Sequence, residues 1–160
     1  MDGCIALSLL VEDIMARDVI TIEDDFSVKY GARMMSLYKI SSLVVLSGDK
    51  VVGILTERDI TSRVVAKGLD PEKVLVKDAM SYPVLVVNPT TSLEEAVKMM
   101  FQKRIKKLPV MNDKEKASEL LGILSITDVA RIQPKMFESL REIVQFETMT
   151  TEIESNYYVR

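Results

Sequence analysis

The sequence contains no histidine and a single cysteine, Cys4. Histidine is the commonest general acid–base residue and a common zinc ligand, so its absence argues against ordinary acid–base catalysis and against a His/Cys zinc site. One cysteine excludes an intramolecular disulfide framework, which agrees with a reducing compartment. We therefore expect a cytoplasmic protein that is not an enzyme, binds no metal and requires no cofactor.

Long apolar runs and charge of one sign are also missing. No stretch approaches the roughly 20 continuous apolar residues of a membrane-spanning helix. The apolar patch at the N-terminus has acidic rather than basic flanks, which argues against a cleaved signal peptide. The net charge is −3 and the basic residues are spread along the chain, unlike the basic face of a nucleic-acid-binding protein. We expect neither a membrane span nor a nucleic-acid partner.

What the chain does contain is an internal repeat. The segment VEDIM at 11–15 matches VKDAM at 76–80, at an offset of 65 (76 − 11 = 65). Later, GILTERDI at 53–60 returns as GILSITDV at 122–129, where the offset is 69 (122 − 53 = 69). The additional residues fall in the polar run 112–118, which predicts a lengthened hairpin turn. Such a period identifies one structural unit built twice.

Each copy shows the same order of local patterns. A short apolar run, VITI at 19–22 or VLVV at 84–87, predicts a strand. Apolar residues spaced i, i+3, i+4, i+7 then predict a helix with one buried face. Two more apolar runs joined by a turn predict an antiparallel hairpin, and a second helix begins near Thr56 or Ser125. The predicted fold is α/β, with two strand–helix–strand–strand–helix repeats.

Residues 133–160 lie outside the repeat. Pro134 suits the first turn of a helix, and an apolar stripe follows at Met136, Leu140, Ile143 and Val144. We expect this helix to dock on the rest of the chain or on a second subunit, with transmission of the ligand state to a partner as an alternative role. The predicted domains are residues 1–68 for the first repeat with its lead-in, 69–132 for the second repeat, and 133–160 for the C-terminal helix and polar tail.

These motifs resemble a tandem of cystathionine-β-synthase-type (CBS) domains, the arrangement called a Bateman module. The VxDxM lead-in, the apolar hairpin and the two octapeptides carry the resemblance over about residues 11–131. It implies two pseudo-symmetric repeats packed as a CBS pair, with AMP, ADP, ATP or S-adenosylmethionine bound in the cleft between them. It also implies a regulatory homodimer whose shape, or whose affinity for a separate protein partner, changes with the ligand. The alternative is an assembly module with no bound nucleotide.

An aspartate and a hydroxyl residue at the start of each second helix are candidate ligand contacts. A carboxylate only accepts hydrogen bonds, so Asp59 or Asp128 can accept from both hydroxyls of a ribose. Thr56 or Ser125 can donate and accept. The same spacing also describes a helix capping box, in which these groups satisfy their own helix end. From the sequence both roles stay open.

The second copy carries more positive charge near this position. Lys106 and Lys107 precede its middle strand and are expected to meet phosphate, or else to protect a solvated strand edge. Arg58 stands where the second copy has Thr127, and either approaches a phosphate or pairs with a neighbouring acid. We expect the Asp128 side to be the stronger site. The predicted ligand-binding residues are Ser125, Thr127, Asp128, Lys106, Lys107, Leu108, Pro109, Arg58, Thr56, Asp59, Ser41, Ser42 and Leu43.

Overall fold

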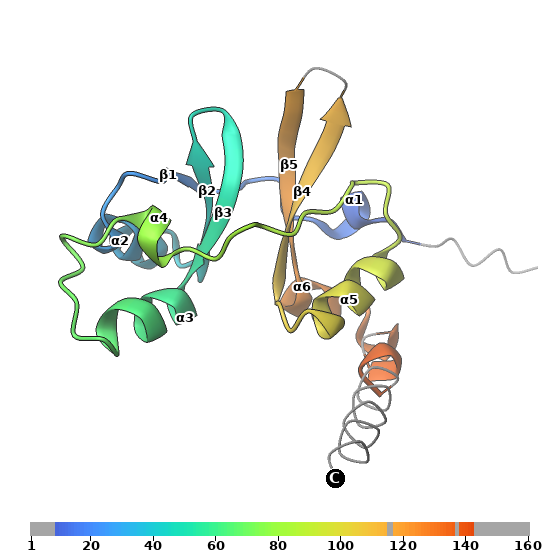
Figure 1. Ribbon diagram of the computed structural model, residues 1–160. Coiled ribbons are helices and arrows are strands. Elements are labelled where there is room, and N and C mark those ends of the chain that lie inside the picture. The colour runs from blue at the N-terminus through green and yellow to red at the C-terminus, as the bar shows by residue number, and fades with distance from the viewer. Residues whose placement is uncertain (1–8, 115–116, 137, 143–160) are drawn as a thin grey trace, which may run out of the picture. The chain divides into compact units, whose positions relative to one another are not determined.

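The computed structural model describes residues 9–114, 117–136 and 138–142, which fall into two compact units (Figure 1). The first-repeat unit spans residues 18–85, and the second-repeat unit combines residues up to 17 with those from 86 onward. Each unit has its own sheet and its own apolar core. The predicted α/β class with two repeats is confirmed.

The first-repeat unit contains a three-stranded sheet in the order β1-β2-β3. Its elements are β1 (Thr21–Glu23), α2 (Val28–Tyr38), β2 (Ser42–Ser47), β3 (Lys50–Thr56), α3 (Glu57–Ile60), the π-helix η1 (Thr61–Val65) and α4 (Val76–Ala79). Strand β1 pairs parallel with β2, and β2 pairs antiparallel with β3. Ser27 caps α2, because its hydroxyl accepts a hydrogen bond from the backbone N of Tyr30 at 3.2 Å.

The second-repeat unit is built around the β4-β5 hairpin. Its elements are α1 (Val11–Ile14), α5 (Leu93–Gln102), β4 (Lys107–Lys114), β5 (Ala117–Ser125) and α6 (Ile126–Ile132). The predicted apolar face of α5 is confirmed, since the four side chains Leu93, Ala96, Val97 and Met100 are at most 1% exposed.

The backbone beyond α6 is helical at 134–136 and 138–142. Leu140 is 6% exposed and joins the core of the second-repeat unit, with Met136 packed against it. The expected docking of a C-terminal helix is therefore confirmed over these residues. Ile143 and Val144 lie outside the described residues.

Two details of the second copy differ from prediction. The strand predicted at 84–87 is wrong except for a single bridge between Val87 and Val110. In the first copy Val44 N donates to the carbonyl of Ile20 at 3.3 Å, but Pro109 stands at the equivalent position and has no N–H. The polar run 112–118 was expected to lengthen a turn. Instead, most of it extends β4 and β5, whose pairing continues to Lys114 and Ala117.

Each repeat packs against the lead-in segment that precedes the other repeat in the sequence. Val76 and Lys77, which precede the second repeat, donate to the carbonyls of Phe26 and Asp24 at 2.8 and 3.0 Å in the first-repeat unit. The same pairs shifted by 65 close the other unit: Val11 N donates to Thr91 O at 2.9 Å and Glu12 N to Pro89 O at 3.1 Å. Hence the compact units are not identical to the sequence repeats, because each repeat is completed by the lead-in of the other.

A glycine in each octapeptide receives the exchanged lead-in. A Cβ atom on Gly53 would lie 2.5 Å from the sulfur of Met80 and 3.0 Å from the carbonyl oxygen of Ser81. Ile54 and Ser81 then exchange two backbone hydrogen bonds, at 3.1 and 2.9 Å. Glycine is needed here because another backbone approaches closely. That backbone belongs to the lead-in, and Gly122 has the same relation to Met15 and Ala16 in the other unit.

Candidate functional site

The turn from β3 into α3 holds Thr56 and Asp59 in a reciprocal capping box. The Thr56 hydroxyl accepts from the backbone N of Asp59 at 3.1 Å. In return, Oδ2 of Asp59 accepts from the backbone N and the hydroxyl of Thr56, at 2.9 and 2.6 Å. One carboxylate oxygen of Asp59 is thus used by its own helix start.

The second oxygen of Asp59 is used by other parts of the first-repeat unit. Oδ1 accepts from the Ser81 hydroxyl at 3.0 Å and lies 3.4 Å from the Arg63 guanidinium. Arg63 also donates to the backbone carbonyls of Ala79 and Met80 and to the Ser81 hydroxyl. We call Thr56, Asp59, Arg63 and Ser81 the Asp59 network. Asp59 is 6% exposed, which this network tolerates because both oxygens are hydrogen-bonded.

The corresponding turn from β5 into α6 is built differently. The Ser125 hydroxyl accepts from Thr127 N at 3.3 Å, two residues on, so Ser125 caps the helix without Asp128. Among the described residues the Asp128 carboxylate has one partner, Arg131, at 3.8 Å. Its side chain is 36% exposed. The sequence motif is therefore the same in both copies, whereas the carboxylate is committed in one and accessible in the other.

Two substitutions between the repeats explain this difference. Ala16 stands at the position of Ser81, at the offset of 65, and Ile132 stands at the position of Arg63, at the offset of 69. Neither side chain can donate a hydrogen bond. Sequence reasoning missed Ser81 and Arg63 as partners of Asp59, although a comparison of the two copies position by position would have shown both differences.

The remaining predicted residues fall into buried and exposed groups. Leu43 and Leu108 are core residues with no exposed surface, and Ser42 is 6% exposed. Pro109 is also buried, and its carbonyl accepts from Val87 N at 3.1 Å. These four positions shape the sheet.

The residues just before each middle strand cap the following helix through their backbone. The carbonyl of Ser41 accepts from Glu57 N at 3.1 Å, and that of Lys106 accepts from Ile126 N at 2.9 Å. Arg58 and Thr127 are exposed, and the cation that pairs with Asp59 is Arg63 rather than Arg58. Lys107 pairs with Ser125 across the hairpin, which places both residues on the same face of it.

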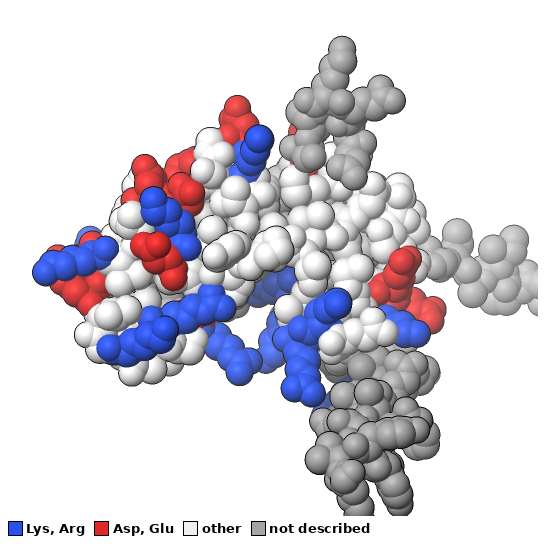
Figure 2. Space-filling view, viewed as in Figure 1, with Lys and Arg blue, Asp and Glu red and all other residues white. Residues whose placement is uncertain are grey.

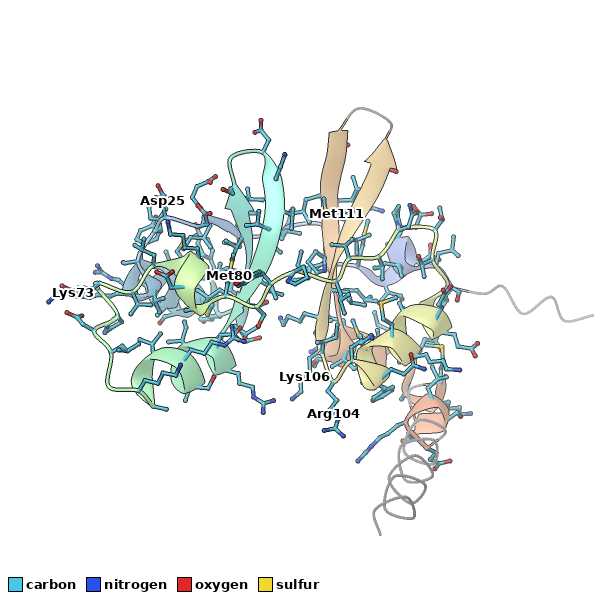
Figure 3. The ribbon with its side chains drawn as sticks, in the orientation of Figure 1. Asp25, Lys73, Met80, Arg104, Lys106 and Met111 are labelled. Carbon is cyan, nitrogen blue, oxygen red and sulfur yellow. The ribbon has the colours of Figure 1, made fainter. Side chains whose placement is uncertain are left out.

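Positive charge gathers at the end of the second-repeat unit where β4 begins. Arg104 and Lys106 project from this end in Figure 3, and Figure 2 shows basic side chains gathered there in the same orientation. Both residues are exposed. Ammonium and guanidinium groups such as these can donate several hydrogen bonds to phosphate oxygens.

Two classes of site find no support in the part of the chain that is described. No group of three or more His, Cys, Asp or Glu residues there is arranged to hold a metal ion. No helix within the same residues has both the length and the apolar character needed to cross a membrane.

The CBS domain family model matches the chain twice, at residues 11–66 and 76–135. The chain therefore belongs to the CBS domain family and contains a tandem pair. The uncharacterized protein MK0525 of Methanopyrus kandleri is 35% identical over 136 residues, which are 84% of this chain and 68% of that protein. The inosine-5′-monophosphate dehydrogenase of Methanocaldococcus jannaschii is 31% identical over 75% of this chain, but the match spans 23% of the enzyme.

Solved structures agree with the fold. A hexameric CBS-CP12 protein from bloom-forming cyanobacteria superposes with a TM-score of 0.71 at 32% identity, over 81% of this chain and 73% of that one. The CBS domain pair of protein MJ0100, in complex with 5′-methylthioadenosine and S-adenosyl-L-methionine, has a TM-score of 0.69 at 24% identity. That match covers 78% of this chain and 94% of the other.

Proposed function

We propose that this chain is a non-catalytic regulatory protein that binds an adenosine compound through Asp128. The ligand class is AMP, ADP, ATP or S-adenosylmethionine. The observation that supports this is the state of the Asp128 carboxylate, which is partly exposed and, among the described residues, has Arg131 at 3.8 Å as its single partner. Both of its oxygens can accept from the two adjacent hydroxyls of a ribose, and a carboxylate–hydroxyl pair is a strong, charge-assisted hydrogen bond.

The surroundings of Asp128 fit the rest of such a ligand. The exposed hydroxyl of Thr127 and the exposed ammonium of Lys106 lie at the same helix start, since Lys106 O accepts from Ile126 N at 2.9 Å. These groups can donate to a phosphate. The domain pair of MJ0100 holds adenosine compounds; it shares only the fold with this chain, so its ligands define the class to be tested.

The regulatory output in this proposal is a population shift. A ligand changes the balance of two arrangements only by the difference in its affinity for them. We propose that the cytoplasmic protein is a homodimer, and that ligand binding alters the dimer or its affinity for a separate protein. No catalytic residue is assigned.

Isothermal titration calorimetry with AMP, ATP and S-adenosylmethionine tests the proposal. We expect binding of at least one compound by the wild type, and a loss of roughly tenfold or more in affinity for Asp128→Asn, which removes one charged acceptor. Arg131→Met is the matched control, because it releases the carboxylate from its ion pair and so does not weaken binding. Absence of binding with all three compounds, or equal binding by Asp128→Asn, would refute the proposal.

An assembly module without a nucleotide is the second candidate, and the exposed face of α2 favours it. Tyr30, Leu37 and Tyr38 are 46%, 74% and 52% exposed and lie on one side of the helix by their spacing. Exposed apolar surface of this kind marks association sites. Leu37→Asp is expected to dissociate the dimer in analytical ultracentrifugation, whereas Val65→Asp, at another exposed apolar position, leaves it intact. Dissociation together with no nucleotide binding would favour the assembly function.

A further inference from the structure

The Asp59 network uses every acceptor position that a ribose would need. Oδ2 is held by Thr56, and Oδ1 is held by Ser81 and Arg63. No buried side-chain nitrogen or oxygen in the described residues lacks a hydrogen-bond partner. A ribose approaching Asp59 must therefore displace existing bonds, whereas within the described residues a ribose approaching Asp128 displaces a single ion pair, with Arg131.

Displacing Arg63 would also disturb the exchanged lead-in. Its guanidinium donates to the carbonyls of Ala79 and Met80 as well as to Ser81. These residues form the segment that pairs with Ile54 through two backbone bonds. Arg63 lies in the π-helix η1, and single π-helical turns are frequent at functional sites. The network thus joins the start of the second helix to the lead-in.

We propose that Arg63 and Ser81 prevent a ligand from binding at Asp59, so that each chain binds one adenosine compound, at Asp128. This inference rests on the proposed function. It adds the number of ligands per chain and the reason why none binds at Asp59. Two repeats that carry the same octapeptide then have different roles. Asp59 holds the lead-in that contains Ser81, which packs within the first-repeat unit. Asp128 binds the ligand.

The two units allow a reciprocal experiment, because the residues that bond Asp59 can be exchanged with the residues at the equivalent positions near Asp128. The double variant R63I/S81A gives the first-repeat unit the side chains found at Ile132 and Ala16. The opposite variant, A16S/I132R, introduces the closing residues beside Asp128. Calorimetry with AMP as the probe measures the stoichiometry and the affinity. Lys67→Ile is the control, since it removes an exposed positive charge near η1 without touching the network.

We expect one AMP per chain for the wild type and for Lys67→Ile, two per chain for R63I/S81A, and an affinity at least roughly tenfold weaker for A16S/I132R. Two AMP molecules per wild-type chain would overturn this inference and leave the proposed function standing. If R63I/S81A does not fold, A16S/I132R decides, because both of its positions are exposed. Unchanged affinity of A16S/I132R would then refute the closing role.

A ligand-free measurement separates failure of this inference from failure of the proposed function. Arg63→Met removes the guanidinium and retains an unbranched stem. We expect amide hydrogen exchange at Ile54 and Ser81 to become roughly tenfold faster, since the lead-in loses its side-chain anchors. Equal exchange rates would refute the network whatever AMP does. Faster exchange combined with no AMP binding by any variant would confirm the structural role of Arg63 and refute the ligand count for AMP. The proposed function is refuted only when ATP and S-adenosylmethionine also fail to bind.

Discussion

Replacing Gly122 with alanine tests how the exchanged lead-in is held. A Cβ atom at this position would lie 2.8 Å from the carbonyl oxygen of Ala16 and 2.7 Å from the sulfur of Met15. A methionine side chain can rotate away, but a backbone oxygen cannot move without shifting the lead-in. Ala16 and Ile123 exchange two hydrogen bonds at 3.0 and 2.9 Å, and the shift breaks both.

The cost follows from these contacts. Each backbone hydrogen bond contributes about 1 kcal/mol net, and overpacking of a well-filled site costs about 1–3 kcal/mol. Gly122→Ala is therefore expected to lower the free energy of unfolding by about 3–5 kcal/mol. Without the close approach, a Gly→Ala change at a compatible position would stabilise the protein by about 0.4–1 kcal/mol. The predicted sign is thus opposite to the ordinary expectation.

Urea denaturation measures the free energy of unfolding, and amide hydrogen exchange shows which backbone hydrogen bonds are weakened. Gly68→Ala is the matched control, since Gly68 has a φ of +64° and no atom near its missing Cβ. It costs only the strain of a left-handed conformation, about 1–2 kcal/mol, and leaves exchange at Ala16 and Ile123 unchanged. If Gly122→Ala is as stable as the wild type, or if those two amides remain protected, the close-approach argument is wrong.

Three further predictions concern single side chains. Asp59→Ala is expected to lower the free energy of unfolding by about 2–4 kcal/mol because it removes a cap and a buried acceptor, whereas Asp128→Ala costs less than about 1 kcal/mol; equal losses in urea denaturation would contradict the different roles of the two residues. Leu140→Ala should cost about 2–5 kcal/mol in the same assay, since the side chain is 6% exposed in the core; a loss below about 1 kcal/mol would mean that the C-terminal helix does not dock. Pro109→Val restores an N–H that can donate to the carbonyl of Leu85, the counterpart of Ile20 in the first copy, and nuclear magnetic resonance should show a slowly exchanging amide at position 109; fast exchange there would refute our explanation of the shortened strand.

Local patterns were sufficient to predict much of the fold. The apolar spacing of α5 is visible in the sequence because a helix that packs on one face needs contacts every three to four residues. Ser92 could be recognised as its cap for a similar reason, and it does accept from Glu95 N at 3.2 Å. The strand at 84–87 could not be judged this way. Whether an apolar run becomes a strand depends on the N–H groups of its neighbour, and Pro109 lacks the one that was needed.

The sequence by itself determined that the chain is one unit built twice, with an aspartate after each GIL segment. Only the tertiary structure decided which lead-in covers which glycine, because residues 15 and 122 are brought together by folding and not by any local preference. The same is true of the two aspartates. Asp59 is satisfied by Ser81, 22 residues away, while the counterpart of Ser81 in the other copy is Ala16, whose side chain cannot donate to Asp128. The free energy of a carboxylate depends on the donors that surround it in space, and a motif alone does not state what those are.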